Sequence, residues 1–386
     1  MGADIEKATQ QKAIKVLMFV DRLLHGGIQT FIWNNINELS ADKIHIELLI
    51  LDDGKHYELE DRMKSKGLII HQLKGIWTDT ITDYFAYIKA VNNFFAEHSD
   101  WDIVHIHSSS KALPVAIAAK KHTNAIIIAH AHSTEFQTVS PFKRIIGNIM
   151  KKIYTHYCDY YIGCSKEAGI WLFGHRIVAS SKFCVMPNGI DFTNFHYNPQ
   201  LRKQIRDQYE IDNCLVLGNL SRLNKEKNQK FLLQIFAEIK KLNPQTALLL
   251  VGDGPDKMEL KCLAKKLGIE KQVIFAGYHS NTAAYLNAMD VFVYPSLFEG
   301  LSISLLEAQG NGLKCFISAN RIPEIVNISG HVEYIALSKS PKAWAEIILA
   351  SKLIRFDTNF LNNNEFDIRK SAKKLQYLYE KIGSSK

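Results

Sequence analysis

The sequence lacks the features that mark membrane-spanning and exported proteins. No apolar run approaches the roughly 18 residues that a membrane-spanning helix needs, and the longest, such as 125–129, are strand-sized. The first fifteen residues, MGADIEKATQQKAIK, contain no apolar signal core, and Glu6 stands where a myristoylation pattern requires Ser or Thr. These absences predict a cytoplasmic protein.

Cysteine pairs and nucleotide-binding fingerprints are also missing. The six cysteines form no C-x-x-C pair, which predicts small packing residues and neither a disulfide framework nor a zinc site. No G-x-G-x-x-G run is present, and Gly252-Asp-Gly254 is followed at once by Pro255, which argues against a dinucleotide cofactor. The absence of G-x-x-x-x-G-K-[ST] argues against a P-loop ATPase.

What the sequence does have is material for large folded cores. It contains 386 residues, of which 47% are hydrophobic and 22% charged, so it is no disordered chain. The length predicts two or three domains. A net charge of +8 permits nucleic acid, anionic lipid or phosphorylated ligands as partners without choosing among them.

Short apolar strands alternate with amphipathic helices along almost the whole chain. The first half is predicted to contain strands at 15–20, 44–51, 103–107, 125–129 and 160–163, with helices at 28–39, 84–98, 113–122 and 141–157. The second half is predicted to contain strands at 214–220, 246–251, 273–276, 291–294 and 313–317, with helices at 228–241, 256–267, 282–288 and 301–309. This alternation predicts parallel sheets covered by helices on both faces.

The alternation pauses at Met186-Pro-Asn-Gly-Ile-Asp191 and resumes after Pro199. We therefore predict two doubly wound α/β domains in tandem, with a boundary at this pause. Ligands of open parallel sheets bind beyond the carboxyl ends of the strands. The loops after the strands of both domains should therefore line one interdomain cleft.

The most informative stretch is PSLFEGLSISLLEAQ, which follows a buried strand and opens a helix. Glu299 lies in its loop and Glu307 about two turns into the helix. The backbone N–H groups from Leu301 and Ser302 to Ser304 would form an anion site at the helix N-terminus. The alternative is local, because Ser304 and Glu307 fit a capping box in which Glu307 bonds back to the helix start.

A second candidate site follows the strand 214–220. Arg222 offers a planar fork of donors and Lys227 a point charge, a combination suited to a diphosphate. The alternative is a solvated charged turn.

A third candidate is Gly26-Gly27, where paired glycines let a backbone approach a phosphate or sugar at a helix start.

Histidines are concentrated in the first half of the chain. His105 and His107 share a strand, and His130 and His132 end the next, so each pair points to one face of the sheet. They could bind zinc, but no H-E-x-x-H or Cys/His spacing accompanies them, and we predict no metal site. His107 is the better placed for the cleft, whereas His105 is more typical of a core residue.

The stretch Phe142–Tyr154 is basic and amphipathic. It could lie on an anionic membrane and bury Ile145, Ile149 and Ile153 there. The alternative, slightly favoured by the sequence alone, is a surface helix that packs these isoleucines on its own sheet.

Together these residues resemble the retaining GT-B glycosyltransferases of family 4, and most closely the bacterial exopolysaccharide and capsule transferases. The resemblance covers nearly the whole chain. It rests on the E-x7-E pair in FEGLSISLLEA, the Gly-Gly loop, DIVHIH, MPNGID, the Arg…Lys pair, VGDGP and MDVFVYPS, which follow one another in the family's order. It implies the GT-B fold, an α/β architecture of two Rossmann-like domains facing across a cleft.

The resemblance also implies domains and roles. Residues 1–191 would bind the acceptor, 192–365 would bind the nucleotide sugar, and a helix within 366–386 would cross back to the first domain. Arg222 and Lys227 would hold the diphosphate and stabilise the leaving nucleotide.

Four further roles follow from the same resemblance. Glu307 would bind the ribose, and Glu299 the hydroxyls of the donor sugar. Gly26 and Gly27 would border the phosphate and acceptor, and His107 would lie near the reacting sugar. The family needs no catalytic metal, and the nucleotide sugar is a substrate, so no cofactor is expected.

Two positions depart from the family pattern. Ser221 replaces the glycine that often precedes the family's arginine, and Lys314 replaces a proline expected at the start of a strand. The first could shift the loop of Arg222 slightly, and the second concerns local geometry.

The sequence thus predicts a cytoplasmic enzyme, peripheral on the membrane, that moves a sugar from a UDP-sugar to a lipid-linked saccharide in surface polysaccharide assembly. No nucleic acid is expected as a partner. Alternatives are a GT-B enzyme with a small soluble acceptor, an epimerase, and an inactive scaffold paralogue of a transferase pair.

Overall fold

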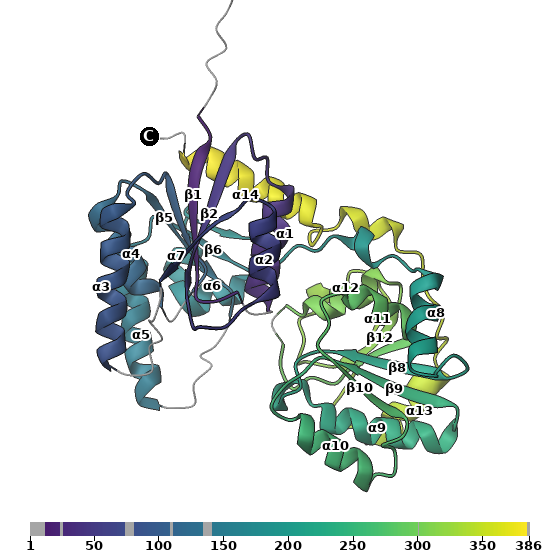
Figure 1. Cartoon of the computed structure of the whole chain (residues 1–386). Coiled ribbons are helices and arrows are strands. Elements are labelled where there is room, and N and C mark those ends of the chain that lie inside the picture. Colours follow the sequence, from purple (N-terminus) through teal and green to yellow (C-terminus); the bar gives the residue numbers. More distant parts are fainter. Residues whose placement is uncertain are drawn as a thin grey trace, which may run out of the picture. The chain divides into compact units, whose positions relative to one another are not determined.

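The computed structural model describes residues 12–23, 26–73, 81–108, 111–133, 141–299 and 301–383. The chain divides into two compact units, Met1–Gly189 with Ile368–Lys386, and Ile190–Asp367 (Figure 1). The domain limits expected from the sequence, 191 and 365, each lie two residues from these borders.

Unit 1 is built on a seven-stranded parallel sheet with the strand order β3-β2-β1-β4-β5-β6-β7. Its strands are β1 Ile14–Val20, β2 Ile44–Leu51, β3 Ile69–Leu73, β4 Ile103–Ile106, β5 Ile126–Ala131, β6 Tyr160–Gly163 and β7 Phe183–Val185. Its helices are α1 Gly27–Glu38, α2 Glu58–Ser65, α3 Ile81–Glu97, α4 Ala112–His122, α5 Pro141–His156, α6 Lys166–Phe173, α7 His175–Val178 and α14 Ile368–Gly383.

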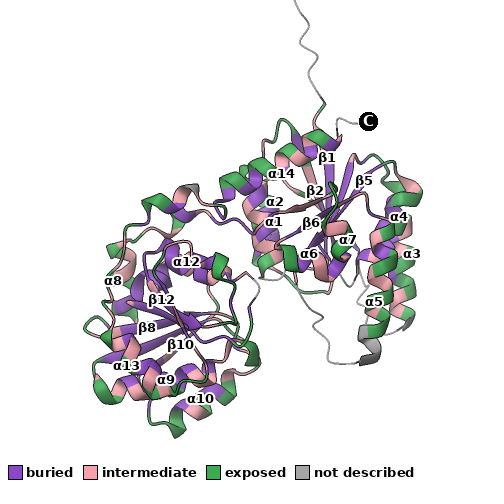
Figure 2. Cartoon of the chain, turned by 180° about the vertical axis from the view of Figure 1, so that it is seen from behind, coloured by how far each residue is buried: buried purple, intermediate pink, exposed green. Residues whose placement is uncertain are grey.

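Helices cover both faces of this sheet, as the apolar strands require. Leu17 and Phe19 of β1 belong to the core under α3, α4 and α5, whereas Val16 and Met18 belong to the core under α1, α2 and α14. Figure 2 shows the strands buried between these helix layers. The strand alternation read from the sequence therefore becomes a doubly wound sheet, as predicted.

Unit 2 has a six-stranded parallel sheet with the strand order β10-β9-β8-β11-β12-β13. Its strands are β8 Leu215–Leu220, β9 Thr246–Val251, β10 Val273–Gly277, β11 Val291–Tyr294, β12 Lys314–Ser318 and β13 Val332–Ile335. Its α-helices are α8 Pro199–Gln208, α9 Gln229–Leu242, α10 Lys257–Lys266, α11 Thr282–Ala288, α12 Ile303–Gly310 and α13 Pro341–Ala350. Its 3₁₀ turns are η1 Phe192–Phe195, η2 Lys225–Lys227, η3 Glu324–Val326 and η4 Asn359–Asn363.

Several elements have no counterpart in the sequence-based prediction. The strands β3, β7 and β13 each lie at an edge of their sheet and are only partly buried, so their apolar pattern is weak. Helix α8 is strongly polar, and its start is marked by Asn198, whose side chain accepts hydrogen bonds from two backbone N–H groups of the first turn. Short edge elements depend on their neighbours more than on their own patterns.

The MPNGID motif lies where the chain leaves unit 1. The Asn34 side chain donates a hydrogen bond to Gly189 O at 3.0 Å, and a Cβ on Gly189 would lie 2.7 Å from the Cα of Ile368. One residue later, Ile190 N donates to Phe366 O at 2.8 Å. The outgoing and returning chain segments therefore run side by side, and the motif's glycine permits their close approach.

Helix α5 does not pack as the favoured alternative predicts. Its isoleucines at 145, 149 and 153 are 60%, 55% and 43% exposed, so the prediction that they pack on the sheet is wrong. Ile146 is also 41% exposed. Lys151, by contrast, lies over the Trp171 ring and donates to Trp171 O at 2.9 Å. No helix among the described residues is long and apolar enough to cross a membrane.

Candidate active site

Six of the predicted site residues come together in unit 2. Arg222 and Lys227 follow β8, Glu299, Leu301 and Ser302 follow β11, and Glu307 lies in α12. Strands β8 and β11 are parallel neighbours, so the loops after them leave the same edge of the sheet. The site thus forms at the carboxyl ends of the central strands.

The centre of this group is an ion pair. Lys227 Nζ lies 2.6 Å from Glu299 Oε1, and the two side chains are only 19% and 8% exposed. The pair joins the 3₁₀ turn after β8 to the loop after β11. A partly buried pair of this kind is screened little by solvent, so both charged side chains are held in place before any ligand arrives.

Neighbouring groups fix the two partners. Ser296 Oγ donates to Glu299 Oε1 at 2.7 Å, and Glu299 N donates to Arg321 O at 3.0 Å. The Asn224 side chain accepts from Lys227 N at 3.3 Å, and Lys227 Nζ lies 6.0 Å from the Tyr294 ring centre. Nothing in the spacing of Ser296 or Tyr294 marks them as site residues, because their role depends on the fold of the loop.

Helix α12 begins at Ile303, two residues earlier than a cap at Ser304 would require. Ser302 is the N-cap, and its hydroxyl accepts from Leu305 N at 3.4 Å. The capping-box alternative for Ser304 and Glu307 is therefore wrong. The N–H groups of Ile303 and Ser304 have no partner within the helix, so this end of α12 can receive an anion.

Glu307 bonds across to another helix. Thr282 Oγ1, in the first turn of α11, donates to Glu307 Oε2 at 3.2 Å. Burial raises the pKa of Glu307 to about 7, and the Thr282 hydrogen bond acts in the opposite direction. Thr282 is 25 residues away in sequence, and no sequence signal connects the two residues.

Two glycines of the VGDGP motif hold the loop that carries Arg222. A Cβ on Gly252, whose φ is +132°, would lie 2.0 Å from Ser221 O, and a Cβ on Gly254 would lie 2.2 Å from Leu223 O. Both residues must therefore be glycine for the β9 loop to press against the β8 loop. Arg222 itself is exposed at the surface of this loop.

The departures from the family pattern have local partners. Ser221 Oγ donates to Asn219 Oδ1 at 2.6 Å and accepts from Gln229 Nε2 at 2.9 Å, so the hydroxyl braces the loop. Lys314 begins β12, and its Nζ lies 3.1 Å from Glu333 Oε2 on β13.

The other predicted site residues belong to unit 1. Gly26 is the N-cap of α1, with an extended backbone at φ 177° that any residue adopts, and Gly27 is the first residue of the helix. Asn188 of the MPNGID motif donates to Gly27 O at 3.4 Å. Their predicted contact with phosphate or acceptor remains a prediction.

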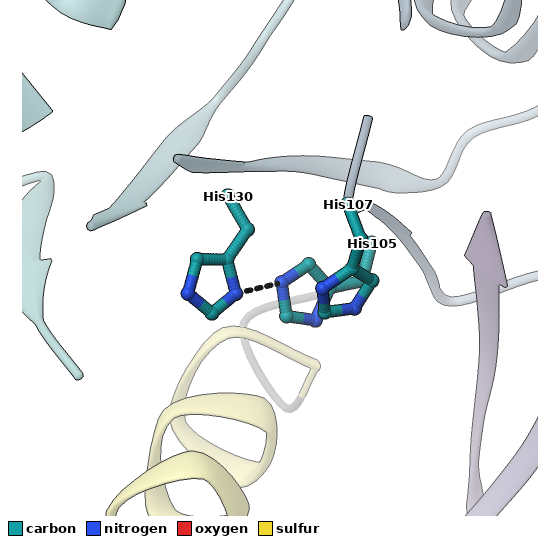
Figure 3. Close-up of side chains that lie close together, drawn as sticks. All are labelled: His105, His107 and His130. Atoms are coloured by element: carbon teal, nitrogen blue, oxygen red, sulfur yellow. Dashed lines mark hydrogen bonds between the residues drawn. The ribbon is translucent and has the colours of Figure 1, made fainter. Parts of the chain in front are cut away.

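His107 lies at the carboxyl end of β4 and is 1% exposed. Its Nδ1 is 3.0 Å from His132 Nε2, and His130 Nδ1 is 3.2 Å from His105 Nε2. Figure 3 shows how closely the rings of His105, His107 and His130 are grouped. The sequence places these histidines on one sheet face; only the fold brings both pairs together.

The arrangement in unit 2 is suited to a charged, hydroxyl-rich ligand. Two cationic side chains and the end of α12 can meet a diphosphate, and two carboxylates can accept hydrogen bonds from hydroxyl groups. Arg222, Lys227 and Glu299 lie on loops that rigid strands hold in place, and Glu307 lies in the helix that follows.

Comparison with known proteins gives matches along most of the chain. Residues 202–353 match the model of glycosyl transferases group 1, and residues 25–194 match that of glycosyltransferase family 4. EpsF of Bacillus subtilis (strain 168), whose name places it among the glycosyltransferases, is 26% identical over 343 residues, 88% of each chain. The capsular polysaccharide biosynthesis glycosyltransferase CapH of Staphylococcus aureus is 24% identical over 376 residues, 95% of this chain and 98% of CapH.

A third relative and one solved structure extend the comparison. The UDP-Gal:alpha-D-GlcNAc-diphosphoundecaprenol alpha-1,3-galactosyltransferase of Escherichia coli is 25% identical over 333 residues, 81% of each chain. The structure of Anabaena Alr3699/HepE in complex with UDP and glucose superposes with a TM-score of 0.70 at 17% identity, over 96% of this chain and 98% of HepE. This likeness shows a shared two-domain fold.

Replacing Glu307 by Gln should stabilise the ligand-free protein at about pH 8 and leave its stability near pH 4.5 unchanged. An unfolded glutamate ionises near 4.5, whereas burial raises the folded pKa to about 7. Between these values the folded state keeps a proton that the unfolded state releases, so stability falls as pH rises. Denaturant unfolding of Glu307→Gln should show a gain of about 1–3 kcal/mol at the higher pH.

Glu259 provides the control, because it is exposed and hydrogen-bonded to Lys230, which lowers its pKa. Glu259→Gln should give no gain at the higher pH. An equal gain in both variants, or none for Glu307→Gln, would show that burial does not disfavour the Glu307 carboxylate.

Proposed function

We propose a function for this chain from the premise that it belongs to the GT-B glycosyltransferases of family 4. It transfers a sugar, with retention of configuration, from a UDP-sugar to a lipid-linked saccharide in surface polysaccharide assembly. The observation that supports binding of the donor is the Lys227–Glu299 ion pair, together with the N-terminus of α12 that follows Glu299 in the chain. The acceptor half is supported by the E. coli relative, whose name gives a diphosphoundecaprenol-linked acceptor, and by CapH.

The donor would bind with its diphosphate at Arg222, Lys227 and the first N–H groups of α12. As the bond to the sugar breaks, negative charge gathers on the leaving diphosphate, and these fixed positive groups stabilise it. Leu301 and Ser302 supply the backbone that leads into the helix. UDP is favoured as the nucleotide because HepE is known in complex with UDP-glucose.

The two carboxylates would orient the rest of the donor. Glu299 would accept hydrogen bonds from the sugar's hydroxyls, and Glu307 from those of the ribose. In a front-face reaction the acceptor hydroxyl attacks on the side of the leaving diphosphate, whose oxygen takes the proton. This chemistry needs neither a covalent nucleophile nor a catalytic metal. Gly26, Gly27 and His107 remain candidates near the acceptor.

Calorimetric titration with UDP, GDP, ADP and dTDP, with and without EDTA, tests the donor. UDP should bind selectively and independently of EDTA. Lys227→Met should weaken UDP binding about 10- to 100-fold, because a hydrogen bond to a charged group contributes about 1.5–3 kcal/mol. Lys225→Met is the matched control, since Lys225 lies on the same 3₁₀ turn but is exposed.

The outcomes separate the alternatives. Binding of another nucleotide would replace UDP in the proposal. If no nucleotide binds, the chain acts as a scaffold paralogue. If Lys225→Met weakens binding as much as Lys227→Met, the turn acts only through its overall charge.

Glu299→Gln should slow transfer about 10- to 100-fold and change UDP affinity much less, because its carboxylate would contact the sugar. Initial rates measured with a UDP-sugar donor and UDP titrations on the same protein give the two values. The exposed neighbour Glu226, changed to Gln, should leave both unchanged. Equal losses of rate and affinity in Glu299→Gln would show that Glu299 acts on the nucleotide, directly or through Lys227, and would contradict its contact with the sugar.

We further propose that α5 holds the enzyme on anionic membranes, where a lipid-linked acceptor lies. Ile145, Ile149 and Ile153 recur at every fourth residue, so they form one stripe along the helix, and all three are exposed. Lys152 lies exposed next to the stripe. The net charge of +8 favours an anionic surface.

Replacing Ile145 and Ile149 together by Ser should weaken binding to phosphatidylglycerol vesicles at least about tenfold, since each isoleucine inserted contributes about 1.5–3 kcal/mol. Vesicle sedimentation measures the effect. Leu242→Ser is the control, because Leu242 is 57% exposed at the end of α9 in unit 2. Unchanged vesicle binding by the double variant would contradict the proposed role of α5.

A further inference from the structure

Unit 1 contains a buried group of four histidines that the proposed transfer reaction does not use as a group. His105 and His107 come from β4 and its end, and His130 and His132 from β5 and its end. His105, His107 and His130 are at most 1% exposed. Helix α1 covers them through Phe31, whose ring meets that of His130 edge-on at 4.7 Å.

The hydrogen bonds within this group leave several ring nitrogens without partners. His105 bonds through Nε2 to His130 Nδ1 at 3.2 Å and through Nδ1 to the Tyr379 hydroxyl at 2.6 Å. His107 bonds through Nδ1 to His132 Nε2 at 3.0 Å. His107 Nε2, His130 Nε2 and His132 Nδ1 are buried with no hydrogen-bond partner among the described residues.

Such a group is costly unless something binds to it. A buried polar atom left without a partner costs about 1–3 kcal/mol. This group contains three of them, and an ion bound by His107 Nε2 would satisfy one. In its neutral form each imidazole ring keeps one nitrogen lone pair. Neutral imidazole is the form that binds divalent transition metals.

The geometry points to a metal-ion site formed by His105, His107 and His130, which would take a borderline divalent cation such as Zn²⁺. One ring nitrogen of each lies within 4.8 Å of those of the other two. Two ligands on one tetrahedral zinc ion lie about 3.3–3.4 Å apart. The 3.2 Å between His130 Nδ1 and His105 Nε2 already matches this separation, as the dashed line in Figure 3 marks.

The surrounding side chains would orient the ligands. Tyr379 of α14 holds His105 Nδ1 and so leaves His105 Nε2 facing His130, which is the usual role of a hydrogen-bond partner behind a ligating histidine. His132 stands in the same relation to His107. Because β4, β5 and α14 all contribute, the ion would fasten the returning helix to the sheet of unit 1.

This site is absent from the sequence-based expectation, which predicted no metal. Sequence spacing shows only that each histidine pair shares a sheet face, whereas the metal set takes ligands from two strands. His105 and His130 have no role in the proposed transfer, and only His107 is also a candidate near the acceptor. Failure of the metal site would leave the nucleotide-binding result untouched.

Cobalt substitution tests the proposal on the full-length protein. After removal of metal with a chelator, Co²⁺ should produce the visible absorption of a tetrahedral site at one ion per chain, and Zn²⁺ should displace it and raise the melting temperature. Elemental analysis of the purified protein should find zinc. No Co²⁺ absorption together with no thermal shift by Zn²⁺ would overturn the proposal.

Variants locate the ion. Tyr379→Phe keeps the packing volume and should weaken Co²⁺ binding about 10-fold, the smaller end of the effect seen for residues behind a ligand. His130→Gln should weaken it further. His122→Gln is the control, because His122 is bonded to Asn92 on the same unit but away from the group.

A second histidine group must also be tested. His71 lies 2.6 Å from Glu47 and close to the His98 ring, and it is the alternative place for a surface-bound ion. If His71→Gln abolishes the Co²⁺ absorption, or if His130→Gln and Tyr379→Phe both bind Co²⁺ like the wild type, the proposed site is wrong.

Discussion

The candidate site depends on the ion pair between Lys227 and Glu299. It joins the loops after β8 and β11, two neighbouring strands of one parallel sheet, at 2.6 Å and with little exposure to solvent. Pulling either partner away would leave a charge buried without its counterpart, which proteins tolerate poorly. The pair therefore holds the loop of Glu299 in place, and that loop leads to the Ser302 cap at which α12 begins.

Close backbone packing holds the third loop of the site, the one after β9, against the loop of Arg222. Gly252 and Gly254 let the loop after β9 press on the loop of Arg222, so three adjacent strand ends are tied into one surface. No single residue in these contacts is marked as a site residue by its type or by its position in the sequence. A sheet with rigid ends and short loops is what allows a mobile, charged substrate to meet groups that are already in position.

Unit 1 uses the same sheet architecture for another purpose. Its strand ends contain buried, neutral imidazoles in place of exposed charges, and Tyr379 brings the last helix of the chain against them. The isoleucines of its helix α5 are exposed to solvent. Exposed apolar surface of this kind is unfavourable in water and is typical of an interaction site. Both features concern what unit 1 binds or how it is fastened, and they are separate from the ion-pair site of unit 2.

The sequence by itself determined the fold class and most of the site. These predictions rest on local patterns: strand periodicity, the pause at 186–199, and the spacing of Glu299 and Glu307. Local patterns can be read from the sequence without knowing the fold. Only the tertiary structure decided that Glu299 pairs with Lys227, that Glu307 bonds to Thr282, and that two histidine pairs become one group. These contacts join residues that are 72, 25 and 25 positions apart. The registers of parallel strands and the closing of loops bring such residues together, and no spacing rule encodes that.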